Sequence, residues 1–290
     1  MTRLHGGKWA CAVFLFCATA ASSPAQTFTT LADFEGRTNG DNPYYMSLVL
    51  GSDGNLFGTT FDGGLYNGGE VFRITLGGTL TALKNFCNPR EGNCPNGGSP
   101  YAGLIQATDG NLYGTTGGGG TNEAGTIFRI SPGGKLTTIY SFCSQPACAD
   151  GIEPIAGLVQ GTDGNFYGTT YSGGLSDSVG TVFKITPGGT LTTLHAFCSK
   201  SRNNMCLDGA NPEGALVQAS GGSFYGTTYA GGTTAQGTVF RITRLGKLTS
   251  SCGSHDRLRH RDHAQRHADQ QRAVPRDPVV VPQSTWRFPS

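Results

Sequence analysis

Short apolar runs separated by glycine-rich turns recur along most of the chain, and no segment keeps the period of an amphipathic helix. One phrase, Phe-Tyr-Gly-Thr-Thr at 166–170, has close counterparts spaced 54 to 58 residues apart. Aromatic and β-branched residues of this kind favour strands. The pattern predicts strands at 56–60, 112–116, 166–170 and 224–228.

Val-Phe-Arg-Ile or a close variant follows each of these strands, and a Leu-Thr segment comes after it. A segment like Gly-Leu-Val-Gln precedes the last three of the strands, so the unit has four short strands. The repeats lie at about 44–87, 100–143, 154–198 and 212–250. Four antiparallel strands in about 55 residues are typical of a propeller blade, whereas the coils of a β-solenoid are shorter. We therefore expect an all-β, β-propeller-like array of four four-stranded antiparallel blades over residues 26–250, either a closed or an incomplete ring.

The turns support a meander. Asp-Gly between the first and second strands predicts a two-residue hairpin of type I′, with positive φ at both central residues. Pro-Gly-Gly at 132–134 and 187–189 predicts type II turns between the third and fourth strands.

Residues 28–34 resemble the fourth strand at 136–142. In a closed ring this segment would pair beside 239–243 and protect the outer edge of the last blade. In an open arc it would remain apart. The degeneration of the last strand at 247–250 favours the open arc.

The first 25 residues have the order of a secretory signal peptide. Arg3 and Lys8 flank the start of an apolar run at 9–21, and Ser23-Pro24-Ala25 offers a cleavage site. An uncleaved anchor is the alternative, but the run is shorter than the about 20 residues that span a bilayer. We expect a secreted or cell-surface protein whose mature chain has no transmembrane segment.

Six cysteines form three pairs that are close in sequence: Cys87 with Cys94, Cys143 with Cys148, and Cys198 with Cys206. They predict local disulfides, which fit an exported protein. Zinc binding is the alternative, but zinc needs four converging ligands and these pairs lie on separate repeats.

Composition excludes one class of partner. The net charge of +2 includes two basic residues before position 26 and seven arginines and four aspartates after position 250, so the body has 12 basic and 15 acidic residues. Such a body has no basic face for nucleic acid. We interpret residues 251–290, rich in Arg and His, as an unstructured tail that is either read out of frame or a solvated extension.

The phrases at 157–160, 163–170 and 181–185 together resemble the GloVer-type tandem repeat of exported bacterial proteins. The resemblance covers about residues 27–249 and implies export and surface display, but no activity. The Asp-Gly-Asn-Leu-Tyr-Gly-Thr phrase is more loosely similar to the blades of sensor-kinase input propellers. The chain departs from the GloVer pattern after residue 250, where the composition changes abruptly and we recognise no anchoring sequence.

In a meander the turns after the second and fourth strands share one face, and here these are the long connections, including the three that carry cysteines. Loops on a rigid scaffold carry function, so this long-loop face is the candidate binding face. On it, aromatic residues occupy equivalent positions and acidic residues could supply charge or bind Ca²⁺. The aromatic positions are Phe61, Tyr171 and Tyr229, with Gly117 interrupting the series, and the acidic positions are Asp62, Glu70, Glu123 and Asp177. Strand-end packing is the alternative role for the aromatic residues, and the Asp-Gly-Asn aspartates are interpreted as turn residues.

No catalytic or cofactor motif stands out. We interpret His195, which lies in a predicted strand, as a structural residue rather than a catalytic one. We expect no cofactor and no metal. The leading hypothesis is a non-enzymatic binding module for a glycan or protein at the cell surface. An extracellular carbohydrate-active enzyme with paired carboxylates on the long-loop face is the alternative, and a purely structural surface repeat is a third.

Overall fold

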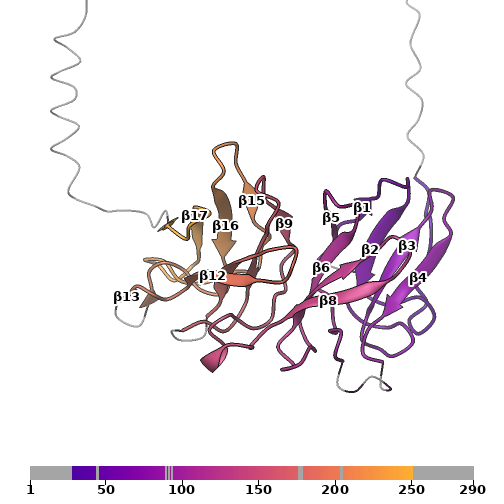
Figure 1. Ribbon diagram of the computed structural model, residues 1–290, viewed down its shortest axis with the longest axis horizontal. Coiled ribbons are helices and arrows are strands. Elements are labelled where there is room, and N and C mark those ends of the chain that lie inside the picture. Colours follow the sequence, from indigo (N-terminus) through magenta and orange to yellow (C-terminus); the bar gives the residue numbers. More distant parts are fainter. Residues whose placement is uncertain are drawn as a thin grey trace, which may run out of the picture.

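The computed structural model describes residues 28–43, 46–88, 90, 92, 94–175, 179–202 and 205–250, so the predicted signal peptide and tail lie outside it. Four antiparallel four-stranded sheets, here called blades one to four, follow one another in chain order (Figure 1). Blade one comprises β1 (Val49–Leu50), β2 (Leu56–Thr60), β3 (Glu70–Ile74) and β4 (Leu80–Asn85), and blade two comprises β5 (Ile105–Gln106), β6 (Leu112–Thr116), β7 (Thr126–Ile130) and β8 (Leu136–Ser141). Blade three comprises β9 (Val159–Gln160), β10 (Phe166–Thr170), β11 (Thr181–Ile185) and β12 (Leu191–Ala196), and blade four comprises β15 (Val217–Gln218), β16 (Phe224–Thr228), β17 (Thr238–Ile242) and β18 (Leu248–Ser250).

The second strands β2, β6, β10 and β16 have the bounds that the sequence predicts, and the all-β fold is confirmed. Two small elements lie in the cysteine-bearing connections: the 3₁₀ turn η2 (Pro146–Cys148) and the hairpin of β13 (Ser201–Arg202) and β14 (Met205–Cys206). Among the described residues, no helix is long and apolar enough to cross a membrane.

All three predicted disulfides are present. Cys87–Cys94, Cys143–Cys148 and Cys198–Cys206 join residues with Cα–Cα separations of 4.0, 4.0 and 4.4 Å. Each bridge closes a short loop at the end of a fourth strand, so each stiffens one long connection.

The hairpin turns differ from the prediction. Between the first and second strands the Gly54 N–H donates to the Gly51 carbonyl, and Gly54 has φ +80° while Asp53 does not enter the positive region. The loop therefore has three residues with one left-handed glycine, not two as in type I′. The turn between the third and fourth strands has the same form, because Gly134 and not Gly133 takes the positive φ.

Each blade has two apolar faces. We call the face toward the next blade the leading face and the face toward the preceding blade the trailing face. The three hydrophobic clusters of the described residues each lie between two successive blades, with the leading face of one packed on the trailing face of the next. Between blades three and four, for example, Tyr167 stacks on Phe224 at 4.0 Å and Phe197 contacts Phe240 edge-on at 5.2 Å.

A glutamine from each of blades two, three and four reaches back to the preceding blade. The Oε1 atoms of Gln106, Gln160 and Gln218 accept from the backbone N–H of Ser52, Thr108 and Thr162, respectively. This is the role of the glutamine in the Gly-Leu-Val-Gln phrase. Blade one has Leu50 at the equivalent position, so it lacks this hydrogen bond.

The strand predicted at 28–34 does not form. The segment nevertheless occupies the place of a fourth strand from a preceding blade, because Phe34 contacts Phe72 edge-on at 5.1 Å, as Phe86 contacts Phe128 at 5.3 Å. A strand needs a hydrogen-bonded neighbour. The third strand that would pair with residues 28–34 is not beside them, so they pack on blade one without a ladder.

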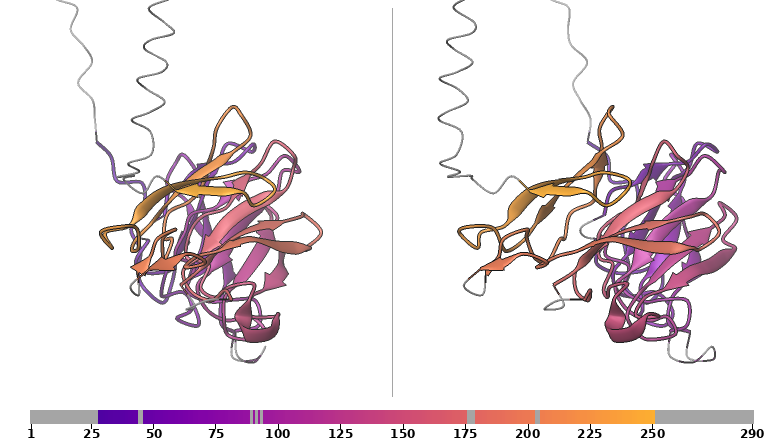
Figure 2. Two further views of the ribbon diagram at one scale, coloured as in Figure 1. Left: turned by 90° about the vertical axis from the view of Figure 1, so that its left-hand side faces the viewer. Right: turned by 60° about the vertical axis from the view of Figure 1, so that its left-hand side comes forward.

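The array is open. Figures 1 and 2 show the blades fanned out in chain order, with blades one and four at its two ends. On blade four, Tyr225 is 41% exposed, whereas its equivalent Tyr167 on blade three is 0% exposed. No further blade covers the leading face of blade four within the described residues.

Candidate functional site

The long connections share one face, as the meander predicts. Isolated β-bridges join the connection after each second strand to the connection that precedes the same blade: Gly98 with Gly118, Ile152 with Ser172, and Ala210 with Ala230. The tight hairpin turns therefore lie at the opposite end of each blade. This long-loop face is where the sequence places the candidate site.

The predicted aromatic residues lie on separate blades rather than in one cluster. The Phe61 ring packs against Tyr101 with centroids 4.4 Å apart. Tyr171 is half-buried, and its backbone bonds to Glu153 and Asn211. Tyr229 is 69% exposed on the last blade. The three residues remain candidates for binding, but they do not form one platform.

The predicted acidic residues have different environments. Asp62 forms an isolated bridge with Asp41 beside blade one. Glu70 is fully buried, and Glu123 lies exposed in the loop after β6. Asp177 lies outside the described residues.

The absence of an aromatic side chain at Gly117 has a steric explanation. A Cβ atom at Gly117 would lie 3.0 Å from the ring of Tyr101. Tyr101 thus covers the position that an aromatic residue holds in the other blades.

The aspartates of the Asp-Gly-Asn turns act locally. The Asp163 carboxylate accepts from the backbone N–H and side-chain amide of Asn165 and from the hydroxyl of Tyr167 at 2.8 Å. Burial acts to raise the pKa of Asp163, but these hydrogen bonds hold it below its usual value. The arrangement fits the predicted turn role.

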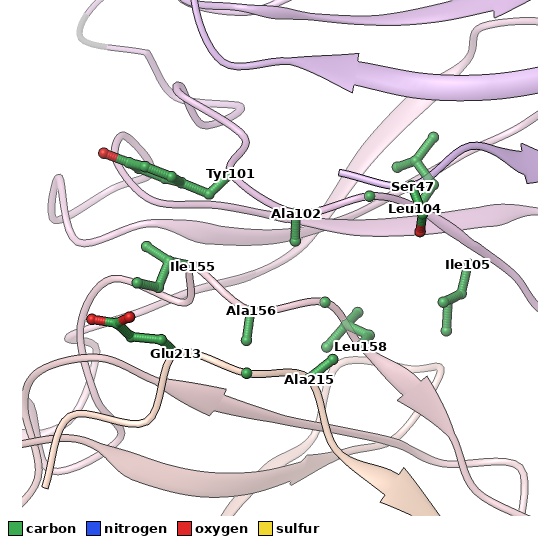
Figure 3. Close-up of a pocket in the computed structure, with 13 residues that line it drawn as sticks. Ser47, Tyr101, Ala102, Leu104, Ile105, Ile155, Ala156, Leu158, Glu213 and Ala215 are labelled. Carbon is green, nitrogen blue, oxygen red and sulfur yellow. The ribbon is translucent and has the colours of Figure 1, made fainter. Parts of the chain in front are cut away.

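A pocket of about 580 Å³ lies where the first strands of the four blades come together (Figure 3). Small residues that precede these strands form its walls, among them Ser47, Ala102, Ala156 and Ala215. Such residues keep the centre open because their side chains do not reach across it. The volume falls within the range of small-molecule sites.

Three residues at equivalent positions differ between the blades and gather at one end of this pocket. They are Tyr101, Ile155 and Glu213 (Figure 3). Each stands just before the small residues of its blade and follows a cysteine-bearing connection, so this end faces the long loops. The pocket end therefore combines a phenol, an aliphatic group and an exposed carboxylate on a constant frame.

The sequence contained a signal for this site. Tyr101-Ala102-Gly103, Ile155-Ala156-Gly157 and Glu213-Gly214-Ala215 are aligned segments in which only the first residue changes in chemical character. A comparison of repeats that looked for variable positions beside constant small ones would have found it. Of the predicted aromatic residues Phe61, Tyr171 and Tyr229, Phe61 contacts the pocket lining, through Tyr101.

A second polar cluster brings together a histidine, an aspartate and a serine. His195 Nε2 lies 3.0 Å from Asp208 Oδ2, and the Ser199 hydroxyl donates to the same oxygen at 2.6 Å. Burial acts to raise the pKa of Asp208, but hydrogen bonds from His195 and Ser199 hold it below its usual value. Both partners bind the carboxylate, so this is not the Ser–His relay of a hydrolase.

The preceding blade repeats this cluster with tyrosine in place of histidine. There the Tyr140 hydroxyl and the Ser144 hydroxyl both donate to Asp150 Oδ2, at 2.8 and 3.1 Å. The shared function of the two clusters is to hold the disulfide loop against the fourth strand. His195 is therefore a structural residue, as its place in a strand indicated.

This equivalence makes a testable prediction. His195→Tyr should change the free energy of unfolding by less than about 0.5 kcal/mol, because tyrosine fits the same role in blade two. Asp208→Ala should cost about 2 kcal/mol, because it removes the acceptor shared by His195 Nε2, the backbone N–H and hydroxyl of Ser199 and the backbone N–H of Lys200. Urea denaturation without reductant measures both. A loss at His195→Tyr as large as that at Asp208→Ala would contradict the equivalence.

Comparison with solved structures gives distant likenesses. A protein of unknown function from Dyadobacter fermentans is 12% identical with a TM-score of 0.47, over 74% of this chain and 69% of that one. A puromycin-hydrolyzing peptidase of Mycobacterium tuberculosis is 15% identical (TM-score 0.42), and PorZ, a surface component of the type-IX secretion system of Porphyromonas gingivalis, is also 15% identical (TM-score 0.42). The matches cover 72% and 71% of this chain, which spans only 29% and 26% of those two proteins.

No curated protein sequence matches the chain. The model of the Gloeobacter/Verrucomicrobia repeat matches it twice, over residues 15–148 and 93–256, which together include all four blades. The resemblance seen in the repeated phrases is thereby confirmed. The chain belongs to the Gloeobacter/Verrucomicrobia repeat family.

Proposed function

We propose that the protein is an exported binding module that holds a short glycan in the pocket between its first strands. The observation that carries this proposal is the contrast between a constant frame of small residues and three varied residues, Tyr101, Ile155 and Glu213, at one end of the pocket. A scaffold that keeps its frame and varies one ring of positions can tune a ligand site without changing its fold.

The chemistry of the pocket end suits a sugar. An aromatic ring offers a face on which the C–H side of a pyranose can stack, and a carboxylate accepts hydrogen bonds from hydroxyl groups. Tyr101 and Glu213 supply these two groups on either side of Ile155 (Figure 3). The predicted residues Phe61, Asp62, Tyr171, Asp177 and Tyr229 would then form outer contacts on the long-loop face.

Export is part of the proposal. The basic and apolar order of residues 1–25 supports it, and so do the three disulfides, because such bonds persist in oxidising compartments. We assign residues 26–250 to the exported repeat domain and place the protein outside the cell or on its surface.

The alternative is a carbohydrate-active enzyme at the same pocket. Hydrolysis of a glycosidic bond requires two carboxyl groups about 5–10 Å apart. Of the described residues that line the pocket, Glu213 alone has a carboxylate. We favour binding for this reason, and a hydrolase screen with chromogenic glycosides tests the alternative.

The binding proposal predicts a specific loss of affinity. In a glycan array followed by calorimetry, Tyr101→Ala and Glu213→Gln should each weaken binding by about tenfold or more, because each removes one direct contact. Leu245→Ala is the matched control, since Leu245 is exposed in a tight turn at the opposite end of blade four. Binding that survives both pocket variants would contradict the site, and glycan turnover that Glu213→Gln abolishes would favour the enzyme.

A further inference from the structure

The leading face of blade four carries the same apolar residues as the buried leading faces of the other blades. Val217, Tyr225 and Val239 are 66%, 41% and 54% exposed, while Tyr167 and Val182 at equivalent positions on blade three are fully buried. Blade four buries that face of blade three through the stack of Phe224 on Tyr167. The sequence of blade four thus provides a docking face that its own fold leaves uncovered.

The trailing face of blade one is the chemical complement. Phe72 and Ile74 stand where the other blades have the phenylalanine and isoleucine that pack on a preceding blade, and here they are already buried, with Phe34 packed on Phe72. The part of this face that stays exposed is at Leu48 and Leu50. Leu48 is 48% exposed, although its equivalents Leu104 and Leu158 are buried in blade junctions. An apolar hollow of about 250 Å³ lies between this face and the segment that includes Leu31 and Phe34.

The outer strand of blade four is short, while residues 28–34 at the other end of the array have the sequence of a complete outer strand. In blade four, β18 has three residues and pairs with Phe240–Ile242, whereas β8 and β12 have six residues each. The residues after Ser250 contain no counterpart of Phe142 at the end of β8. Residues 28–34 match the whole of β8 and end in that phenylalanine, but they have no third strand beside them.

We propose that two copies of the chain join head to tail, with the leading face of blade four of one copy packed on the trailing face of blade one of the other. Residues 28–34 of the second copy then displace the short strand β18 and lie beside β17 as the outer strand, while Phe34 stays on Phe72 as observed. Two such junctions close a ring of two chains with eight blades. The partner is a second copy because within one chain residues 28–34 rest on blade one while the leading face of blade four stays exposed.

The junction between copies should be weaker than the junctions within a chain. Leu50, which is 61% exposed, stands where Gln106, Gln160 and Gln218 bond to the preceding blade, so one hydrogen bond per junction is missing. An association that depends on concentration is therefore expected, rather than a permanent dimer.

Sedimentation velocity of the purified chain over a hundredfold range of concentration tests this proposal. We expect a monomer–dimer equilibrium that Tyr225→Arg and Leu48→Arg each weaken at least tenfold. Leu50→Arg is a second variant of the trailing face in case Leu48→Arg misfolds, and Leu175→Arg, in an exposed loop of blade three, is the control. Circular dichroism verifies the fold of each variant.

Mixing the variants distinguishes the modes of association. A head-to-tail dimer predicts that Tyr225→Arg and Leu48→Arg chains associate with each other better than either does with itself, because the mixture restores one intact junction. Three results would overturn the proposal: a monomer at every concentration, a dimer that Tyr225→Arg disrupts while Leu48→Arg and Leu50→Arg do not, or a dimer that none of these changes disturbs. Glycan binding is measured separately, so its failure leaves this test intact.

Discussion

Replacing Tyr167 with alanine is expected to lower the free energy of unfolding by about 4 kcal/mol, whereas Tyr225→Ala should lower it by less than about 1 kcal/mol. The two tyrosines occupy the same position in successive blades. Tyr167 is fully buried, stacks on Phe224 and donates to Asp163, while Tyr225 is 41% exposed on the last blade. The difference arises from the neighbouring blade and not from the local sequence.

Chemical denaturation at a protein concentration below the dimer range measures this pair of values. Phe183→Ala provides a further comparison, because its ring is buried between blades two and three against Phe142. A loss at Tyr225 equal to that at Tyr167 in the monomer would mean that the chain closes its own ring. Unequal losses would support the open array, in which stability is a sum over blades and junctions.

The second large effect concerns Glu70, a carboxyl group in a place that threonine occupies in the other three blades. In blade two the hydroxyls of Thr116 and Thr126 bond to each other at 2.9 Å, and blades three and four repeat the pair. In blade one neither carboxyl oxygen of Glu70 has a hydrogen-bond partner in the described structure, and the side chain is fully buried. Burial raises the pKa of Glu70 to about 7.

A carboxyl group whose folded pKa exceeds its unfolded value binds its proton more tightly in the native state. Its contribution to stability is therefore fully present below the unfolded pKa and falls as the pH rises from about 4.5 to about 7. The loss should be on the order of 3–4 kcal/mol, since one pKa unit corresponds to about 1.4 kcal/mol. Glu70→Gln should abolish this fall and make the protein more stable than the wild type at pH 8.

Thermal and urea unfolding between pH 4 and pH 9 measures the effect. Glu123→Gln removes an exposed carboxylate from the equivalent loop region of blade two and should leave the pH profile unchanged. Glu70→Thr should remove the pH dependence as well, because it restores the hydroxyl pair of the other blades. A wild-type profile that is flat from pH 4.5 to pH 7.5 would show that Glu70 is not held in the buried state described here.

The sequence by itself determined what depends on short-range pattern. The second strands at 112–116 and 166–170, the three local disulfides and the sharing of one face by the long loops follow from residue type, spacing and chain direction. The predicted turn type was wrong, because the hairpin loops have three residues and not two. A single left-handed glycine such as Gly54 satisfies a three-residue loop, and composition does not distinguish this loop from a two-residue one.

The tertiary structure decided what depends on which segments meet. Residues 28–34 have the sequence of an outer strand, yet they form none, because a strand exists only beside a partner. Tyr101, Ile155 and Glu213 share a pocket because successive blades bring their first strands together, although more than 50 residues separate each from the next. Tyr167 and Tyr225 have nearly the same local sequence and opposite exposure, because burial belongs to the junction between blades and not to the repeat itself.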